Sequence, residues 1–285
     1  MYRNLNPASI GAVASFEELT RQARAANFEG MDIDVLETLN QTKNKTIDYV
    51  KKVFKKNDLC FGGWYLPTRW KEKTEYFEQD LLQLSAQSLL AKQLGCNRAT
   101  TWISSFSDEF SYEENSDWHI DRLTRVAEVL RENDCVLALE FVGTKTFRTG
   151  HKYEFIHSLS GIMTLIEAIR MRNVGLLIDS WHWYVSGGSL EDLQQLSTKE
   201  VFYVHINDAP KNKHRDEQID LIRCLPGETG VIDIVGFLLW LRDMNYHGPV
   251  TPEPFSEKLR GVTASEAISL VGEAVDQVWT KAGLD

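Results

Sequence analysis

The stretch LLIDSWHWYVSGG, from Leu176 to Gly188, changes character in its middle. Its first residues form a short apolar run, which is consistent with a buried strand. Asp179 closes that run, and His182 follows three residues later between two tryptophans. A carboxylate and an imidazole at the end of a buried strand raise the possibility of a parallel sheet whose strand ends carry a site.

Short strand-like runs alternate with longer runs of helical spacing along the whole chain. The expected strands are Gly30–Val35, Leu59–Trp64, Arg98–Ser104, Val136–Phe141, Val174–Asp179, Val201–Asn207 and Pro249–Glu253, with a less regular one near Leu5–Val13. Apolar residues fall on one stripe in Asp117–Asn133 and in Ala264–Ala282, which predicts helices there. Ser15 and Ser189 each precede an acidic residue by three positions, as helix N-caps do.

Eight strand-like and eight helix-like runs predict a parallel sheet with crossover helices. An open doubly wound sheet and a closed barrel both fit this pattern. The count of eight, the polar residues at several strand ends and the lack of a Gly-rich turn after the first strand favour the barrel. We therefore expect an α/β fold, a (β/α)8 TIM barrel, with residues 1–285 as a single domain.

Composition narrows the class of protein. The chain has 285 residues, 43% hydrophobic and 25% charged, as soluble globular proteins have. The formal net charge of -10 argues against a nucleic-acid partner. Met1–Gly11 lacks the blocks of a signal peptide, no apolar run is long enough for a membrane helix, and the four cysteines form no CxxC pair. We expect a cytoplasmic protein with reduced thiols.

Four successive strand ends carry residues of the kind that bind metals: Glu140, Asp179, His205 and Glu253. Each alone has an ordinary interpretation, such as a cap, an ion pair or a buried hydrogen-bonded histidine. Because neighbouring strand ends in a curved sheet lie close together, these side chains can converge. Three converging carboxylates repel one another, which one divalent metal ion relieves. The ligand types suit Mn²⁺, Co²⁺, Mg²⁺ or Zn²⁺ without choosing among them.

The motifs LEF with Glu140, DSWH with Asp179, HIND with His205, RCLPGETG with Arg223 and PEPF with Glu253 occur in this order. Together with NFEGMDIDV, residues 27–35, this set resembles the xylose-isomerase-like sugar phosphate isomerase/epimerase superfamily, which includes ketose 3-epimerases and inosose isomerases. The resemblance covers roughly residues 9–282 and implies a TIM barrel.

The resemblance also implies roles for individual residues. Glu140, Asp179, His205 and Glu253 would hold one divalent metal ion, and Glu140 and Glu253 would act as acid and base on opposite faces of the substrate. His182 and Arg223 would bind substrate oxygens. Arg215 is a competing candidate in the same loop, because the turn at residues 226–230 has one residue more than the family's usual PGxG.

Such a site supports several reactions. A metal ion bound to adjacent carbonyl and hydroxyl oxygens acidifies the neighbouring C–H and stabilises an enediolate, and a carboxylate beside it can take the proton. Isomerisation or epimerisation of a sugar, sugar phosphate or keto-cyclitol is the leading hypothesis. A lyase, such as a keto-inositol or dehydroshikimate-type dehydratase, starts the same way. The AP endonuclease branch and a non-catalytic barrel are weaker alternatives, the first because GGWYLP and TTWISS offer no histidines.

Aromatic residues follow the expected strands. Trp64 and Trp102 are candidates for a wall that binds a sugar or cyclitol, because aromatic faces stack on C–H surfaces; simple packing is the alternative. We expect a small-molecule substrate such as a sugar or cyclitol, with a place in carbohydrate metabolism or inositol catabolism, no nucleic acid and no membrane partner. A homo-oligomer remains open.

Overall fold

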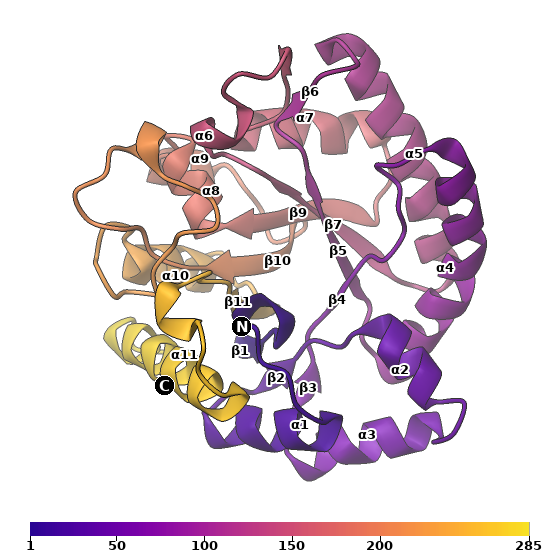
Figure 1. Ribbon diagram of the computed structural model, residues 1–285, viewed down its shortest axis with the longest axis vertical. Coiled ribbons are helices and arrows are strands. Elements are labelled where there is room, and N and C mark those ends of the chain that lie inside the picture. Colours follow the sequence, from indigo (N-terminus) through magenta and orange to yellow (C-terminus); the bar gives the residue numbers. More distant parts are fainter. Residues whose placement is uncertain (285) are drawn as a thin grey trace.

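The computed structural model describes residues 1–284, and its strands form a curled parallel sheet (Figure 1). The strands of this sheet are β1 (Tyr2–Leu5), β2 (Gly30–Met31), β3 (Cys60–Phe61), β4 (Trp64–Tyr65), β5 (Arg98–Ile103), β7 (Val136–Phe141), β9 (Val174–Asp179), β10 (Val201–Ile206) and β11 (Pro249–Pro252). Their order is β3-β2-β1-β11-β10-β9-β7-β5-β4. The four strands that carry the expected ligands are therefore direct neighbours.

The sheet closes through a strand that is broken in two. β3 pairs with β2, β4 pairs with β5, and only Gly62 and Gly63 separate β3 from β4. The expected strand Leu59–Trp64 is therefore not continuous. Its first part, β3, pairs with β2, and β4, which begins at Trp64, pairs with β5. A Cβ atom on Gly62 would collide with the side-chain oxygens of Asn4 and Asp32 inside the barrel, so the break brings the backbone close to a buried polar group. Counting both pieces as one strand gives the eight-stranded TIM barrel.

Two further strand predictions need correction. The first strand is Tyr2–Leu5, and the expected strand near Leu5–Val13 contains instead a 3₁₀ turn, η1 (Ala8–Ile10). The second pairs only over Gly30–Met31, because Asp34 accepts hydrogen bonds from the N–H groups of Leu36 and Glu37 and starts a helix. A capping side chain competes with strand pairing at this point.

Helices surround the barrel (Figure 1). They are α1 (Phe16–Ala25), α2 (Val35–Gln41), α3 (Ile47–Lys56), α4 (Thr74–Leu94), α5 (Tyr112–Glu132), α6 (Lys145–Arg148), α7 (Leu159–Ile169), α8 (Ser180–Val185), α9 (Leu190–Gln194), α10 (Ile234–Asp243) and α11 (Ala264–Lys281). Ser15 and Ser189 cap α1 and α9 as expected. None of the helices within residues 1–284 is both long and apolar enough to span a membrane.

The alternation of side chains along the central strands separates two environments. On β7, the large residues Leu137, Leu139 and Phe141 are fully buried in the main core, where the helices pack. The small Ala138 instead packs with Tyr203 in the barrel interior. Glu140 lies on this inner face, two residues further along β7. The carboxyl ends of the strands also carry a short antiparallel pair, β6 (Phe106–Ser107) with β8 (Tyr153–Glu154), and the 3₁₀ turns η2 (Arg215–Glu217) and η3 (Glu257–Leu259).

Candidate metal centre and substrate cavity

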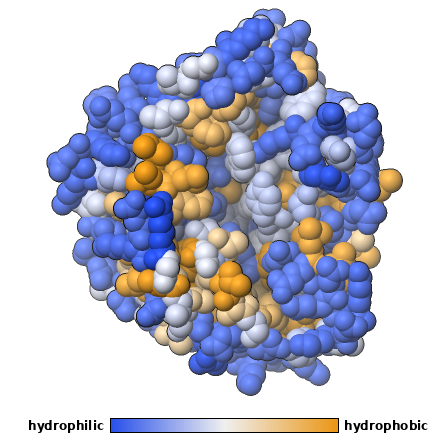
Figure 2. Space-filling model, in the orientation of Figure 1, coloured by the Kyte–Doolittle hydropathy of each residue, from blue (hydrophilic) through white to orange (hydrophobic). Residues whose placement is uncertain are grey.

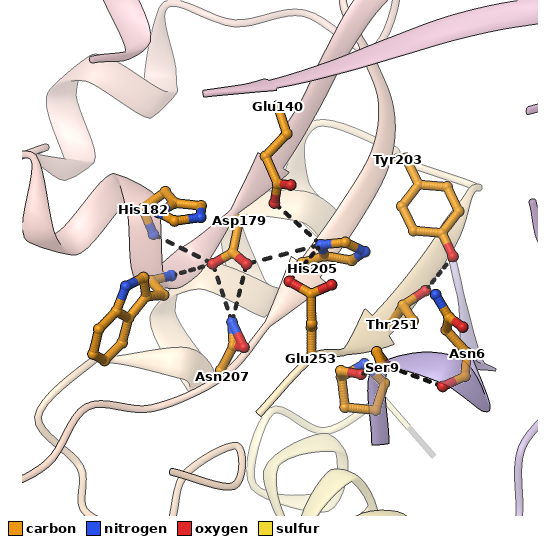
Figure 3. A network of polar contacts seen from close by, with 12 residues as sticks. Asn6, Ser9, Glu140, Asp179, His182, Tyr203, His205, Asn207, Thr251 and Glu253 are labelled. Atoms are coloured by element: carbon orange, nitrogen blue, oxygen red, sulfur yellow. Dashed lines mark hydrogen bonds and ion pairs between the residues drawn. The ribbon is translucent and has the colours of Figure 1, made fainter. Parts of the chain in front are cut away.

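The four strand-end residues meet at one point in the barrel. Glu140, Asp179, His205 and Glu253 each offer one ligand atom, and these atoms lie within 4.8 Å of one another. Strand register brings them together, because His205 is paired with Asp179 on β9. Figure 3 shows Glu140 and Glu253 approaching the ring of His205 from opposite sides. Three carboxylates and one imidazole in this space form a donor set that fits a divalent cation.

The imidazole of His205 is the centre of the cluster. Its Nδ1 lies 3.2 Å from Glu140 Oε1, 3.4 Å from Glu253 Oε2 and 3.8 Å from Asp179 Oδ2. Burial would lower the pKa of His205, but Glu253 and Glu140 outweigh it and raise the pKa well above its ordinary value. Burial raises the pKa of Glu140, against the opposing influence of His205. Without a metal ion, the shared proton of His205 relieves part of the repulsion between the acids.

Asp179 has two separate tasks, one for each oxygen. Its Oδ1 accepts hydrogen bonds from the N–H groups of Trp181 and His182 and so caps α8. Its Oδ2 faces His205 and Arg223. Burial would raise the pKa of Asp179, but Arg223 and the nearby histidines lower it to about 2. Asp179 can therefore cap α8 with one oxygen and offer the other oxygen to a metal ion.

Arg223 enters the cluster from the loop between β10 and α10. Its Nη1 lies 3.0 Å from Asp179 Oδ2 and 3.3 Å from Glu253 Oε2. Its guanidinium is almost completely buried and sits 4.7 Å from the ring of Phe255. Phe255 has a φ of 36°, an uncommon conformation for a residue with a bulky side chain. Burial would lower the pKa of Arg223, but Asp179 and Asp220 raise it, so the group stays charged.

The two ring nitrogens of His182 contact different parts of the site. Nδ1 accepts from the backbone N–H of Gly143 at 3.2 Å, and Nε2 lies 3.2 Å from Nη2 of Arg223. The same Nη2 donates to Oδ1 of Asp220 at 2.7 Å. Arg223 therefore links His182 to Asp220.

A cavity of about 720 Å³ opens above the cluster. Figure 2 shows this face hollowed in its centre, with hydrophobic residues along part of the rim. One wall is apolar and largely aromatic, and the floor is polar. The wall includes Tyr65, Trp102, Val142, Phe147, Ile219, Leu221 and Phe255, and the floor includes Glu140, His182, Asp220, Arg223 and Glu253.

Of the residues expected to line the cavity, the structure places some there and others elsewhere. Trp102 lines the cavity. Trp64 does not: it is fully buried, and its indole N–H donates to the carbonyl of Cys96. Its neighbour Tyr65 lines the cavity instead. Both residues belong to β4, the short strand that follows the break at Gly62 and Gly63. Arg215 lies on the exposed surface over the ring of Tyr184, so Arg223 is the arginine of this loop that reaches the cluster.

Sequence reasoning missed Asp220 and Asn207, and it saw Asp208 only as part of a motif. Asn207 donates to both oxygens of Asp179, at 3.0 and 3.1 Å. Asp208 accepts from the backbone N–H groups of Thr229, Gly230 and Ile232 and so holds the turn that follows Arg223. The sequence indicates Asp220 only through its spacing, because it lies three residues before Arg223 and can pair with it.

Comparisons with known proteins agree with this architecture. The chain is 30% identical over 165 residues to inosose isomerase of Bacillus licheniformis, a match that covers 57% of this chain and 55% of that protein. It is 29% identical over 104 residues to 3-dehydroshikimate dehydratase of Pseudomonas aeruginosa, covering 34% of this chain and 15% of that protein. The chain thus matches about half of the length of the first relative and a small part of the second.

Solved structures extend the similarity over the whole barrel. A xylose isomerase domain protein from Alicyclobacillus acidocaldarius superimposes with a TM-score of 0.88 at 29% identity, covering 99% of both chains. A structure of the IolI protein with a bound zinc atom has a TM-score of 0.81 at 21% identity, again over 99% of both chains, and shares the fold. A family model described as xylose isomerase-like TIM barrel matches residues 20–279. The chain belongs to the xylose isomerase-like TIM barrel family.

Proposed function

We propose that this protein is a divalent-metal-dependent isomerase or epimerase of an uncharged cyclitol or sugar. The observation that carries the proposal is the buried quartet of Glu140, Asp179, His205 and Glu253 at the floor of the cavity. Three acids held this close are costly unless a cation joins them. The family and the inosose isomerase relatives support the same class of reaction.

The quartet would hold the metal ion, in keeping with its three oxygen ligands and one imidazole. Such an ion acidifies the C–H beside a ketone carbonyl and stabilises the negative charge that develops when the proton leaves. This donor set accommodates Mn²⁺, Co²⁺, Mg²⁺ or Zn²⁺.

The protein's own residues supply the proton transfer. Glu140 and Glu253 come from different strand ends, approach Nδ1 of His205 and both line the cavity, so each carboxylate can face a substrate bound above them (Figure 3). One glutamate removes the proton and the other returns it, to the same carbon in an epimerase or to its neighbour in an isomerase. The side chains of His182 and Arg223 bind substrate oxygens, and Trp102 covers the C–H surface.

The charges of the cavity favour an uncharged substrate. Arg223 is the one Lys or Arg side chain among the lining residues, and the negative charges of Asp179, Asp220 and Glu253 around its guanidinium outweigh its single positive charge. A phosphate or carboxylate on the substrate would meet Asp220 and the two glutamates. The amine of Lys71, beside Trp102, is not among the lining residues, and burial lowers its pKa to about 7, which weakens it as a partner for an anion. This favours a keto-cyclitol over a sugar phosphate, and over the carboxylate-bearing substrate of a dehydroshikimate-type dehydratase. The dehydratase is the second candidate because relatives named 3-dehydroshikimate dehydratase match part of the chain.

The test is solvent proton exchange. We expect metal-loaded protein to incorporate deuterium from D₂O beside the carbonyl of keto-inositols, measured by NMR, and to convert them into isomers. Glu140→Gln should reduce exchange by at least 100-fold, since general base catalysis contributes about 10²–10⁴-fold. Glu154→Gln, an exposed glutamate on β8, is the matched control and should exchange at the wild-type rate. Release of water from 3-dehydroshikimate, with no exchange into ketones, would support the dehydratase instead.

A further inference from the structure

Asp220 is a carboxylate of the cavity that the quartet does not include. It lies in the loop between β10 and α10, its side chain is 24% exposed, and it lines the substrate cavity. Its backbone carbonyl accepts from Nε of Arg223 at 2.9 Å. Its Oδ1 accepts from Nη2 of the same guanidinium at 2.7 Å. The two contacts fix the position of the carboxylate relative to the floor of the site.

One oxygen of this carboxylate is still available. Within residues 1–284, the side chain accepts one hydrogen bond, from Nη2 of Arg223 to Oδ1, and Oδ2 has no protein partner. Burial would raise the pKa of Asp220, but Arg223 and His182 lower it, so the group is an ionised acceptor. An ionised acceptor that lines a cavity is suited to a hydroxyl donor.

The surroundings strengthen such a contact. Ile219 and Leu221 flank Asp220 in the chain and line the same cavity. A substrate that fills the space between these side chains and Trp102 excludes water from the carboxylate. Hydrogen bonds to a charged group are stronger when water is excluded.

We propose that Asp220 is a specificity-determining residue, whose Oδ2 accepts a hydrogen bond from a substrate hydroxyl that lies away from the quartet. This inference rests on the proposed function, because it names the ligand of the same cavity. The inference predicts that one position of the substrate ring carries a hydroxyl. A hydrogen atom, an amide or an anionic group at that position would bind less well. A ring that lacks this hydroxyl leaves a desolvated charge without a partner.

A second role of Asp220 must be separated from this one. Because Nη2 of Arg223 donates to Oδ1 and lies 3.2 Å from Nε2 of His182, the carboxylate also positions the guanidinium beside His182. If that were its whole role, its removal would weaken all ligands of the cavity by a similar factor. Direct contact predicts instead that removal abolishes discrimination at one ring position only.

The experiment measures binding of myo-inositol and of each of its single deoxy analogues to the metal-loaded protein by calorimetry. For the wild type we expect one deoxy analogue to bind about 10- to 100-fold more weakly than the parent, in line with a hydrogen bond to a charged group. Asp220→Ala should weaken binding of the parent by a similar factor and bind that analogue and the parent within about 2-fold. Asp220→Asn keeps the shape and an acceptor and should retain part of the discrimination.

The controls keep the outcomes distinct. Asp216→Ala removes an exposed carboxylate of the same loop, which pairs with Lys145, and should leave the binding pattern unchanged. The metal content of Asp220→Ala should equal that of the wild type, which excludes a collapsed site. An unchanged penalty for every deoxy analogue in Asp220→Ala would overturn the inference while leaving the proposed function intact. Normal discrimination in binding with no proton exchange into keto-inositols would overturn the function alone, and wild-type protein that binds none of the polyols would overturn both.

Discussion

The guanidinium of Arg223 lies 3.0 Å from the carboxylate of Asp179. Asp179 is completely buried, and so is nearly all of the Arg223 side chain. One fixed positive charge therefore stands beside the quartet and offsets part of its negative charge. Removing one partner of a buried ion pair costs far more than removing an exposed one, because the other charge stays buried.

Arg223→Met tests this relationship. Without metal, the variant leaves the acids short of their cation, so we expect the free energy of unfolding to fall by roughly 3 kcal/mol. A bound divalent ion would replace the missing charge, so most of the loss should disappear with Mn²⁺ present. Urea denaturation in EDTA and in Mn²⁺ measures both values. Arg215→Met, on the surface, is the control, and an equal loss in EDTA and Mn²⁺ would contradict the electrostatic account.

Tyr203→Phe probes a second buried network, below the quartet. The hydroxyl of Tyr203 donates to Asp32 at 2.6 Å and accepts from Thr251 at 2.8 Å. Its loss leaves Oδ2 of the buried acid without a donor, while Asn4 and Gly63 still donate to Oδ1, and we expect a destabilisation of about 2 kcal/mol at pH 8.

The destabilisation should also depend on pH. Burial raises the pKa of Asp32, while the hydrogen bond from Tyr203 opposes that rise. Without the bond the folded-state pKa rises further, so stability falls more steeply as pH increases above 3.8, the ordinary value of the group. Denaturation at pH 5 and pH 8 measures the difference. Tyr246→Phe, whose hydroxyl donates to the neutral carbonyl of Pro249, is the matched control and should lose the same amount at both values.

Much of the candidate site could be predicted from local sequence. Strand ends in a parallel barrel share one edge, so four ligand-type residues at successive strand ends predicted a common location, and the structure brings them together. Their role as metal ligands stays a prediction. Trp64 was expected at the cavity because it ends a strand, but Tyr65, its neighbour on β4, points to the opposite face and lines the cavity instead.

Loop geometry could not be predicted in the same way. Arg223 lies in a loop that Asp208 closes, because the carboxylate of Asp208 accepts from the backbone N–H groups of Thr229 and Gly230. Such contacts join residues about twenty positions apart without any periodic pattern. From the sequence, a cap and a metal ligand are alternative interpretations of Asp179. In the structure its side chain caps α8 and also faces the quartet.

Lys71→Met tests a buried amine beside the cavity. Nζ of Lys71 lies 3.0 Å from the centre of the Trp102 ring, and burial lowers its pKa to about 7, against the opposing influence of Glu140. Between about pH 7 and 10.5 the unfolded chain holds a proton that the folded chain lacks, so wild-type stability gains a contribution that rises with pH. From pH 7 to 9 we expect this gain to be on the order of 1 kcal/mol and absent in the variant. Equal pH slopes for wild type and Lys71→Met would contradict it, and Lys73→Met is the exposed control.

The central claim is that the quartet holds one divalent metal ion, and metal content per chain tests it most directly. Elemental analysis would compare wild type with Asp179→Asn and Asp179→Ala, all purified without chelators and then dialysed against Mn²⁺. Asp179→Asn can still accept the hydrogen bonds that cap α8, which separates loss of the metal from loss of the fold. The account predicts about one ion per wild-type chain, with occupancy strongly reduced in both folded variants. Wild-type protein without metal after dialysis, or full occupancy in the variants, would contradict it.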